Sequence, residues 1–279
     1  MDQLYEIYTN RLKRIDTEFV RYLHSKINWK SRLIVITGAR GVGKTTMLLQ
    51  HIKLNKIENH SLYLSADSIY FAENTLYNVA SKFCKLNGKF LFIDEVHKYK
   101  NWSVEVKMMY DNLPDLNIVV TGSSVLDISK GLEADLSRRA IAYNLEGLSF
   151  REYLNFTLGT NINPVSLQNI LSHSYSLPEN ISHPISYWVE YLKVGYYPFF
   201  KEDNFYTRLD NVVNQTLEVD IPTYANMNVS TSVKLKRLLY IVARSVPFKP
   251  NITKIGRAIG ADRGTVADYF VYMERAGLI

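Results

Sequence analysis

The sequence predicts an α/β fold in which a parallel sheet, covered by helices on both faces, precedes a smaller all-α region. Short runs of apolar and β-branched residues, suited to strands buried on both faces, recur between residues 33 and 145. Helical stretches fill the gaps between these runs. Strands that alternate with helices form parallel sheets, whose ligands bind at the carboxyl ends of the strands. The strand candidates are residues 33–37, 62–65, 90–94, 117–121 and 140–145.

A glycine-rich segment, GARGVGKTT at residues 38–46, separates the first strand candidate from a helical stretch. Its Gly-x4-Gly-Lys-Thr spacing fits the phosphate loop, in which backbone N–H groups and a lysine surround a polyphosphate and the threonine holds Mg²⁺. The helix that begins there directs its positive dipole end at the same anion. A glycine turn without a ligand is the alternative, and the strand–loop–helix order argues against it. The expected nucleotide contacts are Gly38, Ala39, Arg40, Gly41, Val42, Gly43, Lys44, Thr45 and Thr46.

Adjacent carboxylates end the third strand candidate, in the sequence KFLFIDEVHK. A buried strand that delivers Asp94 to its carboxyl end can place that carboxylate on the Mg²⁺ held by Thr45, which is the Walker B role. Glu95 is then placed to polarise an attacking water, and Lys44 to neutralise the β/γ-phosphates. Two acids in a solvated turn are the alternative. Because the loop and the acids are joint requirements of one metal site, we expect ATP and Mg²⁺ as cofactors and ATP hydrolysis as the reaction.

The order of the motifs favours an ATPase over a GTPase. A complete strand and helix, at about residues 62–87, separate the phosphate loop from the Walker B strand. This inserted strand is typical of P-loop ATPases that carry a catalytic glutamate. The segment NKIE at residues 55–58 lacks the final Asp of a guanine-reading motif, and DEVH at residues 94–97 is not the Asp-x-x-Gly of a GTPase switch.

Further candidates for contact with the transferred phosphate follow the fourth strand candidate. Ser123 or Thr121 would contact the γ-phosphate or the water as a sensor, whereas Ser123 and Ser124 would otherwise cap a turn. Arg138 and Arg139 precede the last strand candidate, where an arginine can stabilise charge on the nucleotide of a neighbouring subunit. A local salt bridge is the alternative. The intersubunit role requires a homo-oligomer.

The charge distribution points to a phosphate-backbone partner at the C-terminal end. The net charge is +6, yet residues 221–261 contain no acidic side chain. Such a basic region suits DNA, and a solvated helix face is the alternative. Its positive side chains are Lys234, Lys236, Arg237, Arg244, Lys249, Lys254 and Arg257. No apolar stretch reaches the length of a membrane span and the N-terminal residues lack a signal-peptide pattern, so we expect a cytoplasmic protein without membrane contact.

The last thirty residues predict two short helices around a turn at Gly260. Asn251 and Asp262 are suited to cap them, and apolar residues recur at helical spacing in both. The pair resembles helix-turn-helix DNA readers. Its outward positions are Arg263, Thr265 and Asp268, of which the aspartate disfavours contact with a polyanion.

The segments TGARGVGKTT, LFIDEVHKYKNWSVEVKMMYD, VVTGSSVLDISKG, ADLSRRA and GLSFREYL together resemble prokaryotic AAA-like P-loop ATPases related to the archaeal ATPase and STAND groups. The resemblance implies ATP binding with Mg²⁺, a helical lid and a winged helix-turn-helix. It further implies a Gly-x-Pro-like lid motif whose proline touches the adenine or ribose. Gly195 and Pro198 match this motif with one extra residue, or they end the preceding helix. Several members carry a further nuclease-like C-terminal domain, and because this sequence stops at MERAGLI we expect it to be either a truncated chain or a shortened member.

From these observations we expect three parts: an ATPase core at residues 1–154, a linker and helical lid at 155–225, and a winged-helix-like module at 226–279. The leading functional hypothesis is an Mg²⁺-dependent ATPase that couples nucleotide state to movement of the lid and winged helix. The alternative is a nucleotide-gated DNA-binding or regulatory switch with little turnover. A helicase is disfavoured, because the chain is too short for a second motor domain of similar size.

Overall fold

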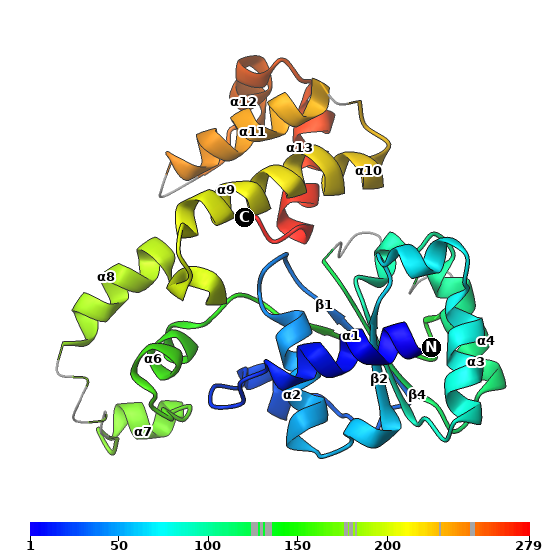
Figure 1. The fold of residues 1–279 in the computed structure, drawn as a ribbon. Helices are drawn as coiled ribbons and strands as arrows, with labels where there is room; N and C mark the ends of the chain where they lie inside the picture. The colour runs from blue at the N-terminus through cyan, green and yellow to red at the C-terminus, as the bar shows by residue number, and fades with distance from the viewer. Residues whose placement is uncertain are drawn as a thin grey trace.

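The computed structural model describes residues 1–123, 128, 131, 136–175, 178, 181, 183–228, 230–245 and 249–279. Its centre is a five-stranded, fully parallel sheet with the strand order β2-β3-β4-β1-β5 (Figure 1). The strands are β1 (Leu33–Thr37), β2 (Ser61–Ser65), β3 (Phe90–Asp94), β4 (Asn117–Gly122) and β5 (Ile141–Asn144). The predicted α/β class is therefore confirmed, and β4 lies between β1 and β3, the strands that precede the phosphate loop and end in the Walker B carboxylate.

The sheet holds together because its central strands are apolar throughout. The four apolar residues that begin β1 are fully buried, and β1 pairs in register with β4 from Leu33–Ile118 to Thr37–Gly122. Two pairs of helices cover the sheet, with α1 and α2 on one face and α3 and α4 on the other (Figure 1). These helices are α1 (Asp2–Lys13), α2 (Lys44–Leu54), α3 (Leu76–Lys85) and α4 (Trp102–Asn112). This placement follows from right-handed crossovers, because the chain reverses its direction across the sheet after β2.

Short 3-10 turns connect these elements. They are η1 (Tyr22–Ser25), η2 (Glu58–His60), η3 (Ile69–Ala72), η4 (Val96–Lys98) and η6 (Pro198–Lys201). The sheet is followed by α6 (Phe150–Leu158), α7 (Leu167–Leu171) and α8 (Pro184–Val194). Ser149 and Glu152 form a capping box that starts α6. The described part of the Asn- and Pro-rich stretch between α6 and α8 contains one short helix, α7.

Residues 205–279 form a helical unit with its own core, here called the C-terminal module. It contains α9 (Phe205–Gln215), a π-helical turn η7 (Thr216–Asp220), α10 (Ile221–Ala225), α11 (Ser230–Ala243), α12 (Ile252–Ile259) and α13 (Arg263–Arg275). Leu217 and Ile221 pack in one hydrophobic cluster with residues of α11, α12 and α13. Figure 1 shows this module apart from the sheet, on the side of the phosphate loop that its residues Asp220 and Gly277 contact.

The predicted helix pair near the C-terminus is present. Asn251 accepts a hydrogen bond from the backbone of Lys254 at the start of α12, and Asp262 accepts one from Thr265 at the start of α13. Gly260 ends α12 in the left-handed conformation, with φ of 67°. Residues 277–279 form no strand, so the winged form remains a prediction. None of the described helices is long and apolar enough to cross a bilayer.

A buried histidine of α2 predicts a pH-dependent stability. His51 stacks on Trp29 with ring centroids 3.6 Å apart, and its Nδ1 lies 3.2 Å from His24 Nε2. Burial, reinforced by His24, lowers the pKa of His51 from 6.5 to about 3. The unfolded chain therefore binds more protons than the folded chain between those values, so the free energy of unfolding falls as the pH falls through that window.

Urea unfolding between about pH 7 and pH 4 measures this effect. His51→Phe, which keeps an aromatic ring on Trp29, is expected to flatten the acid limb by up to about 1.4 kcal/mol per pH unit. His60→Gln is the matched control, because His60 is exposed. Identical pH profiles for the wild type and His51→Phe would contradict the assignment.

Candidate functional site

The phosphate loop, residues 38–45, joins β1 to α2. Gly38, Gly41 and Gly43 all have positive φ, at 148°, 84° and 97°. A Cβ on Gly38 would lie 2.1 Å from the carbonyl oxygen of Leu145, and one on Gly41 would lie 2.7 Å from the ring of Phe199. These glycines therefore serve both the loop conformation and its close packing against the segments beside it.

The side chain of Lys44 folds over its own loop. It is 5% exposed, and its ammonium donates to the carbonyl oxygens of Gly38 at 2.8 Å and Ala39 at 2.9 Å. Burial lowers the pKa of Lys44 to about 8, against the opposing effect of the Glu95 and Asp94 carboxylates. The loop thus holds a desolvated cation, whose attraction for an anion is stronger than it would be in water.

Asp94 is the centre of a buried hydrogen-bond network. Its Oδ2 accepts from the Thr45 hydroxyl at 2.5 Å and from the Tyr63 hydroxyl at 2.8 Å. Its Oδ1 accepts from the Thr121 hydroxyl. Thr121 thus touches the Walker B carboxylate, although a sensor role was considered for it. Sequence reasoning did not find Tyr63. The signal that could have found it is a tyrosine hydroxyl in β2, the buried strand that pairs with the strand of Asp94.

The Thr45 and Asp94 oxygens form a donor set that fits Mg²⁺. This ion takes oxygen ligands and usually keeps waters and substrate phosphates beside one or two carboxylates. Within the described residues no group of three or more His, Cys, Asp or Glu side chains is placed to bind a metal. The residues present therefore match a site that a bound triphosphate completes, and they do not match an all-protein metal site.

Glu95 lies beside this network in a strained backbone position. Its φ is 51°, and its Oε2 accepts from the Ser123 hydroxyl at 3.1 Å. Burial raises the pKa of Glu95, while Lys44 acts in the opposite direction. His97 Nε2 lies 3.6 Å from the same oxygen, and burial lowers the pKa of His97 to about 4. Ser123 and a neutral His97 therefore border the carboxylate, whereas Ser124 lies outside the described residues.

The two arginines before β5 lie away from the phosphate loop of their own chain. Arg139 pairs with Asp111 through Nε at 2.9 Å and Nη2 at 3.0 Å, which matches the local salt bridge considered for it. Arg138 is exposed. Both residues sit at the amino end of β5, whereas the loop follows the carboxyl end of the parallel β1. An action on a neighbouring subunit therefore stays a prediction, and the exposed Arg138 is the better placed of the two.

A pocket of about 570 Å³ opens beside the loop. Lys44, Thr45 and Glu95 line one part of it, and Ile15, Phe19, Phe156, Pro198 and Phe199 supply an apolar part. Pro198 Cγ would lie 3.8 Å from a Cβ on Gly43, so the proline packs directly over the loop. A polar floor with apolar walls suits a phosphorylated ligand with a planar ring. The contribution of residues 14–21 to this wall was not predicted.

Arg21 fastens that N-terminal segment to the loop. It is 7% exposed, and its guanidinium donates to the carbonyl oxygen of Val42 at 2.5 Å and to those of Glu146 and Gly147. Its Nε donates to Glu152 at 2.9 Å. Burial acts to raise the pKa of Glu152, but Arg21 and backbone N–H groups outweigh burial and lower it. Arg21 therefore contacts the phosphate loop through its hydrogen bond to Val42, and its buried ion pair with Glu152 of α6 holds the guanidinium in that position.

Of the three outward positions predicted for DNA contact, two are exposed in the structure and one is held by a neighbouring side chain. Thr265 is engaged with Asp262, because its hydroxyl donates to Oδ2 at 2.5 Å. Arg263 and Asp268 are exposed on α13. The basic side chains Lys254 and Arg257 are exposed on α12. Arg237, Arg244 and Lys249 are exposed as well, so the cations available to an anionic partner are spread from α11 through α12 to the start of α13.

Two family models match separate parts of the chain, one over the sheet region and one over the C-terminal helices. Residues 30–154 match a family described as AAA domain, and residues 185–279 match a domain of unknown function. The uncharacterised protein MJ1637 of Methanocaldococcus jannaschii is 26% identical over 98% of this chain and 61% of its own length. A second uncharacterised protein of that organism, MJ1544, is 31% identical over 60% of this chain and 36% of its own length. The chain thus spans less than two thirds of either relative.

Solved structures with similarity to the chain include AMPPCP-bound DnaA from Aquifex aeolicus, at 13% identity and a TM-score of 0.36 over 97% of this chain and 88% of that one. PCH-2 of C. elegans matches at 16% identity and a TM-score of 0.34, over 99% of this chain and 66% of that one. Scores this low carry no argument about function. The five-stranded parallel sheet and the loop geometry agree with the family match: residues 30–154 have the fold of a P-loop NTPase and are similar to the AAA domain family.

Proposed function

We propose that this protein binds ATP with Mg²⁺ and hydrolyses it. The observation that carries the proposal is the 2.5 Å hydrogen bond between Thr45 and Asp94, which joins the phosphate loop to the Walker B strand. It brings together the two oxygen ligands that a P-loop magnesium site requires, beside a buried lysine. A glycine turn without a ligand gives no reason for this convergence of side chains from separate strands.

Each polar side chain then has a role in phosphoryl transfer. Lys44 neutralises charge on the β/γ-phosphates, and Thr45 with Asp94 would hold the Mg²⁺, which supplies charge neutralisation at the same oxygens. Glu95 accepts a proton from the attacking water, with Ser123 orienting the carboxylate. Its raised pKa brings the carboxyl closer to the operating pH, as suits a general base. The apolar wall around Phe19 and Pro198 would hold the base and ribose.

We further propose that nucleotide state moves the α6–α8 region and the C-terminal module. Two contacts support this. Phe199 packs on Gly41, and Gly277 packs on Ala39, so parts of the chain on both sides of the pocket touch the phosphate loop itself. A ligand that displaces the loop must therefore disturb both contacts.

Equilibrium titration with ATP and GTP in the presence of Mg²⁺ tests the proposal. We expect saturable ATP binding with weaker GTP binding, because the sequence lacks the guanine-reading aspartate. Crystals soaked with an ATP analogue give the decisive view. A triphosphate lodged anywhere other than between Lys44, Thr45 and Asp94 would refute the site.

A nucleotide-gated DNA-binding switch is the second candidate. It is supported by the exposed Lys254 and Arg257 on α12 and by the absence of acidic residues from 221 to 261. Binding of duplex DNA with and without ATP, at rising salt, separates the two functions. Affinity that falls steeply with salt and changes with ATP favours the switch. ATP turnover that is unaffected by DNA, together with weak DNA binding, favours the ATPase alone.

A further inference from the structure

An ion cluster connects the C-terminal module to the phosphate loop. Asp220, the last residue of the π-helical turn η7, places both carboxylate oxygens 3.3 Å from Arg40 Nη2. Its Oδ1 also lies 3.6 Å from the ammonium of Lys98. Arg40 belongs to the phosphate loop, and Lys98 follows the Walker B acids. A single carboxylate from the C-terminal module thus contacts cations next to both nucleotide motifs.

The burial of this carboxylate makes the cluster more than a surface salt bridge. The side chain of Asp220 is 9% exposed, and that of Arg40 is 30% exposed. Arg40 Nε is buried and has no hydrogen-bond partner among the residues that the structure describes. A carboxylate at this depth requires its cations, and each cation loses a defined position without the carboxylate. The unmet donor shows that the guanidinium has hydrogen-bonding capacity left for a further acceptor.

Arg40 is also close to the reacting end of the site. Its positive charge adds to burial in lowering the pKa of Lys44, and it acts against burial at Glu95, whose pKa burial raises. The negative charge of Asp220 acts on Lys44 and on His97 as well. The charges of the cluster therefore act on both the lysine and the proposed general base.

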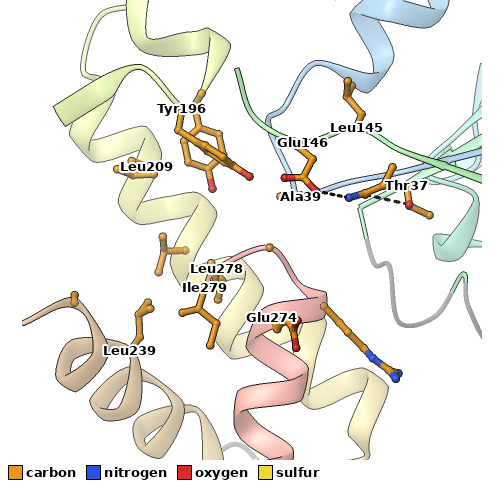
Figure 2. Close-up of a pocket in the computed structure, with 16 residues that line it drawn as sticks. Thr37, Ala39, Leu145, Glu146, Tyr196, Leu209, Leu239, Glu274, Leu278 and Ile279 are labelled. Atoms are coloured by element: carbon orange, nitrogen blue, oxygen red, sulfur yellow. Dashed lines mark hydrogen bonds between the residues drawn. The ribbon is translucent and has the colours of Figure 1, made fainter. Parts of the chain in front are cut away.

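A second contact brings the same module to the same loop. A Cβ on Gly277 would lie 3.0 Å from Cβ of Ala39, the residue before Arg40. Both residues of this second contact line a cavity of about 1020 Å³. Figure 2 shows Thr37, Ala39 and Glu146 on one side of it and Leu239, Glu274 and Leu278 of the module on the other. Asp220 and Gly277 are thus two described points at which the module meets the phosphate loop.

We propose that Asp220 is a positioning residue for ATP hydrolysis, supplied from outside the AAA-like domain. It holds Arg40 and Lys98 at the edge of the triphosphate site, so that turnover requires the C-terminal module to be docked. This inference rests on the proposed ATPase function. The π-helical turn η7, which ends at Asp220, fits this role, since such turns alter the direction of side chains within a helix and are frequent at functional sites.

The test compares kcat and the Kd for ATP in wild type and Asp220→Asn. The variant loses one negative charge beside the phosphates, so ATP binds as tightly as before or more tightly. Loss of the fixed position of Arg40 lowers kcat by about 10- to 100-fold. Glu218→Gln is the matched control, because Glu218 lies in the same turn but pairs with the exposed Lys236 inside the module. It is expected to keep wild-type kcat.

A double variant shows whether Asp220 acts through Arg40. Arg40→Gln combined with Asp220→Asn is expected to have nearly the kcat of Arg40→Gln alone, whereas independent roles would give additive losses. Undiminished kcat in Asp220→Asn would overturn the positioning role. So would a loss of kcat and ATP affinity that runs in parallel with a loss of thermal stability. Either result would leave the proposed ATPase function standing. A wild-type protein that neither binds nor hydrolyses ATP would overturn the proposed function as well.

Discussion

Replacement of Glu95 with Gln is expected to lower the rate of ATP hydrolysis by about 10²- to 10⁴-fold, the range of general base catalysis. The amide keeps the size of the side chain and can still contact Ser123, whose hydroxyl lies 3.1 Å from Glu95 Oε2. It cannot accept a proton from water. ATP binding should persist, because the phosphate contacts belong to Lys44 and the loop.

Single-turnover hydrolysis and equilibrium ATP binding, measured on the same preparation, check this prediction. Glu73→Gln removes an exposed carboxylate and serves as the control for a general change of charge. Survival of the wild-type rate in Glu95→Gln would show that another group activates the water. The nucleotide-gated switch with little turnover would then become the better account.

Replacement of Lys44 with Ala is expected to lower kcat by at least about 10²- to 10³-fold, as for the loss of one preorganised donor to a developing charge, and to weaken ATP binding. The buried ammonium is the positive group that the loop holds among its carbonyl oxygens. Alanine leaves those carbonyl oxygens in place without the cation. The triphosphate would then meet uncompensated negative dipoles.

Calorimetric titration with Mg²⁺ and ATP measures the loss of affinity. Because Lys44 is buried, thermal unfolding of the variant must accompany the titration, and a folded variant with lost binding supports the site. Lys82→Ala removes an exposed lysine on α3 and should bind ATP as the wild type does. Undiminished affinity in Lys44→Ala would disprove the role of the loop as the phosphate site.

Features that depend on residues close together in the sequence were predicted correctly, whereas contacts between residues far apart in the sequence were not. The strand, loop and helix around Gly38 to Thr45 are local in sequence, and their pattern specifies backbone geometry within a few residues. Asp94 was predicted because a hydrophobic strand must present its last residue at the carboxyl edge. Tyr63, Arg21 and Asp220 were not predicted as site residues. Nothing in their local sequence distinguishes them from ordinary core or surface residues.

The sequence by itself determined the parallel α/β sheet, the phosphate loop and the carboxylates that follow β3, because hydrophobic periodicity and motif spacing act over short segments. Only the tertiary structure decided which side chains surround those motifs. Asp220 reaches Arg40 across 180 residues, and Arg21 reaches Glu152 across 131. Such contacts depend on how whole layers pack, since the buried charges must find partners wherever the packed elements bring them together.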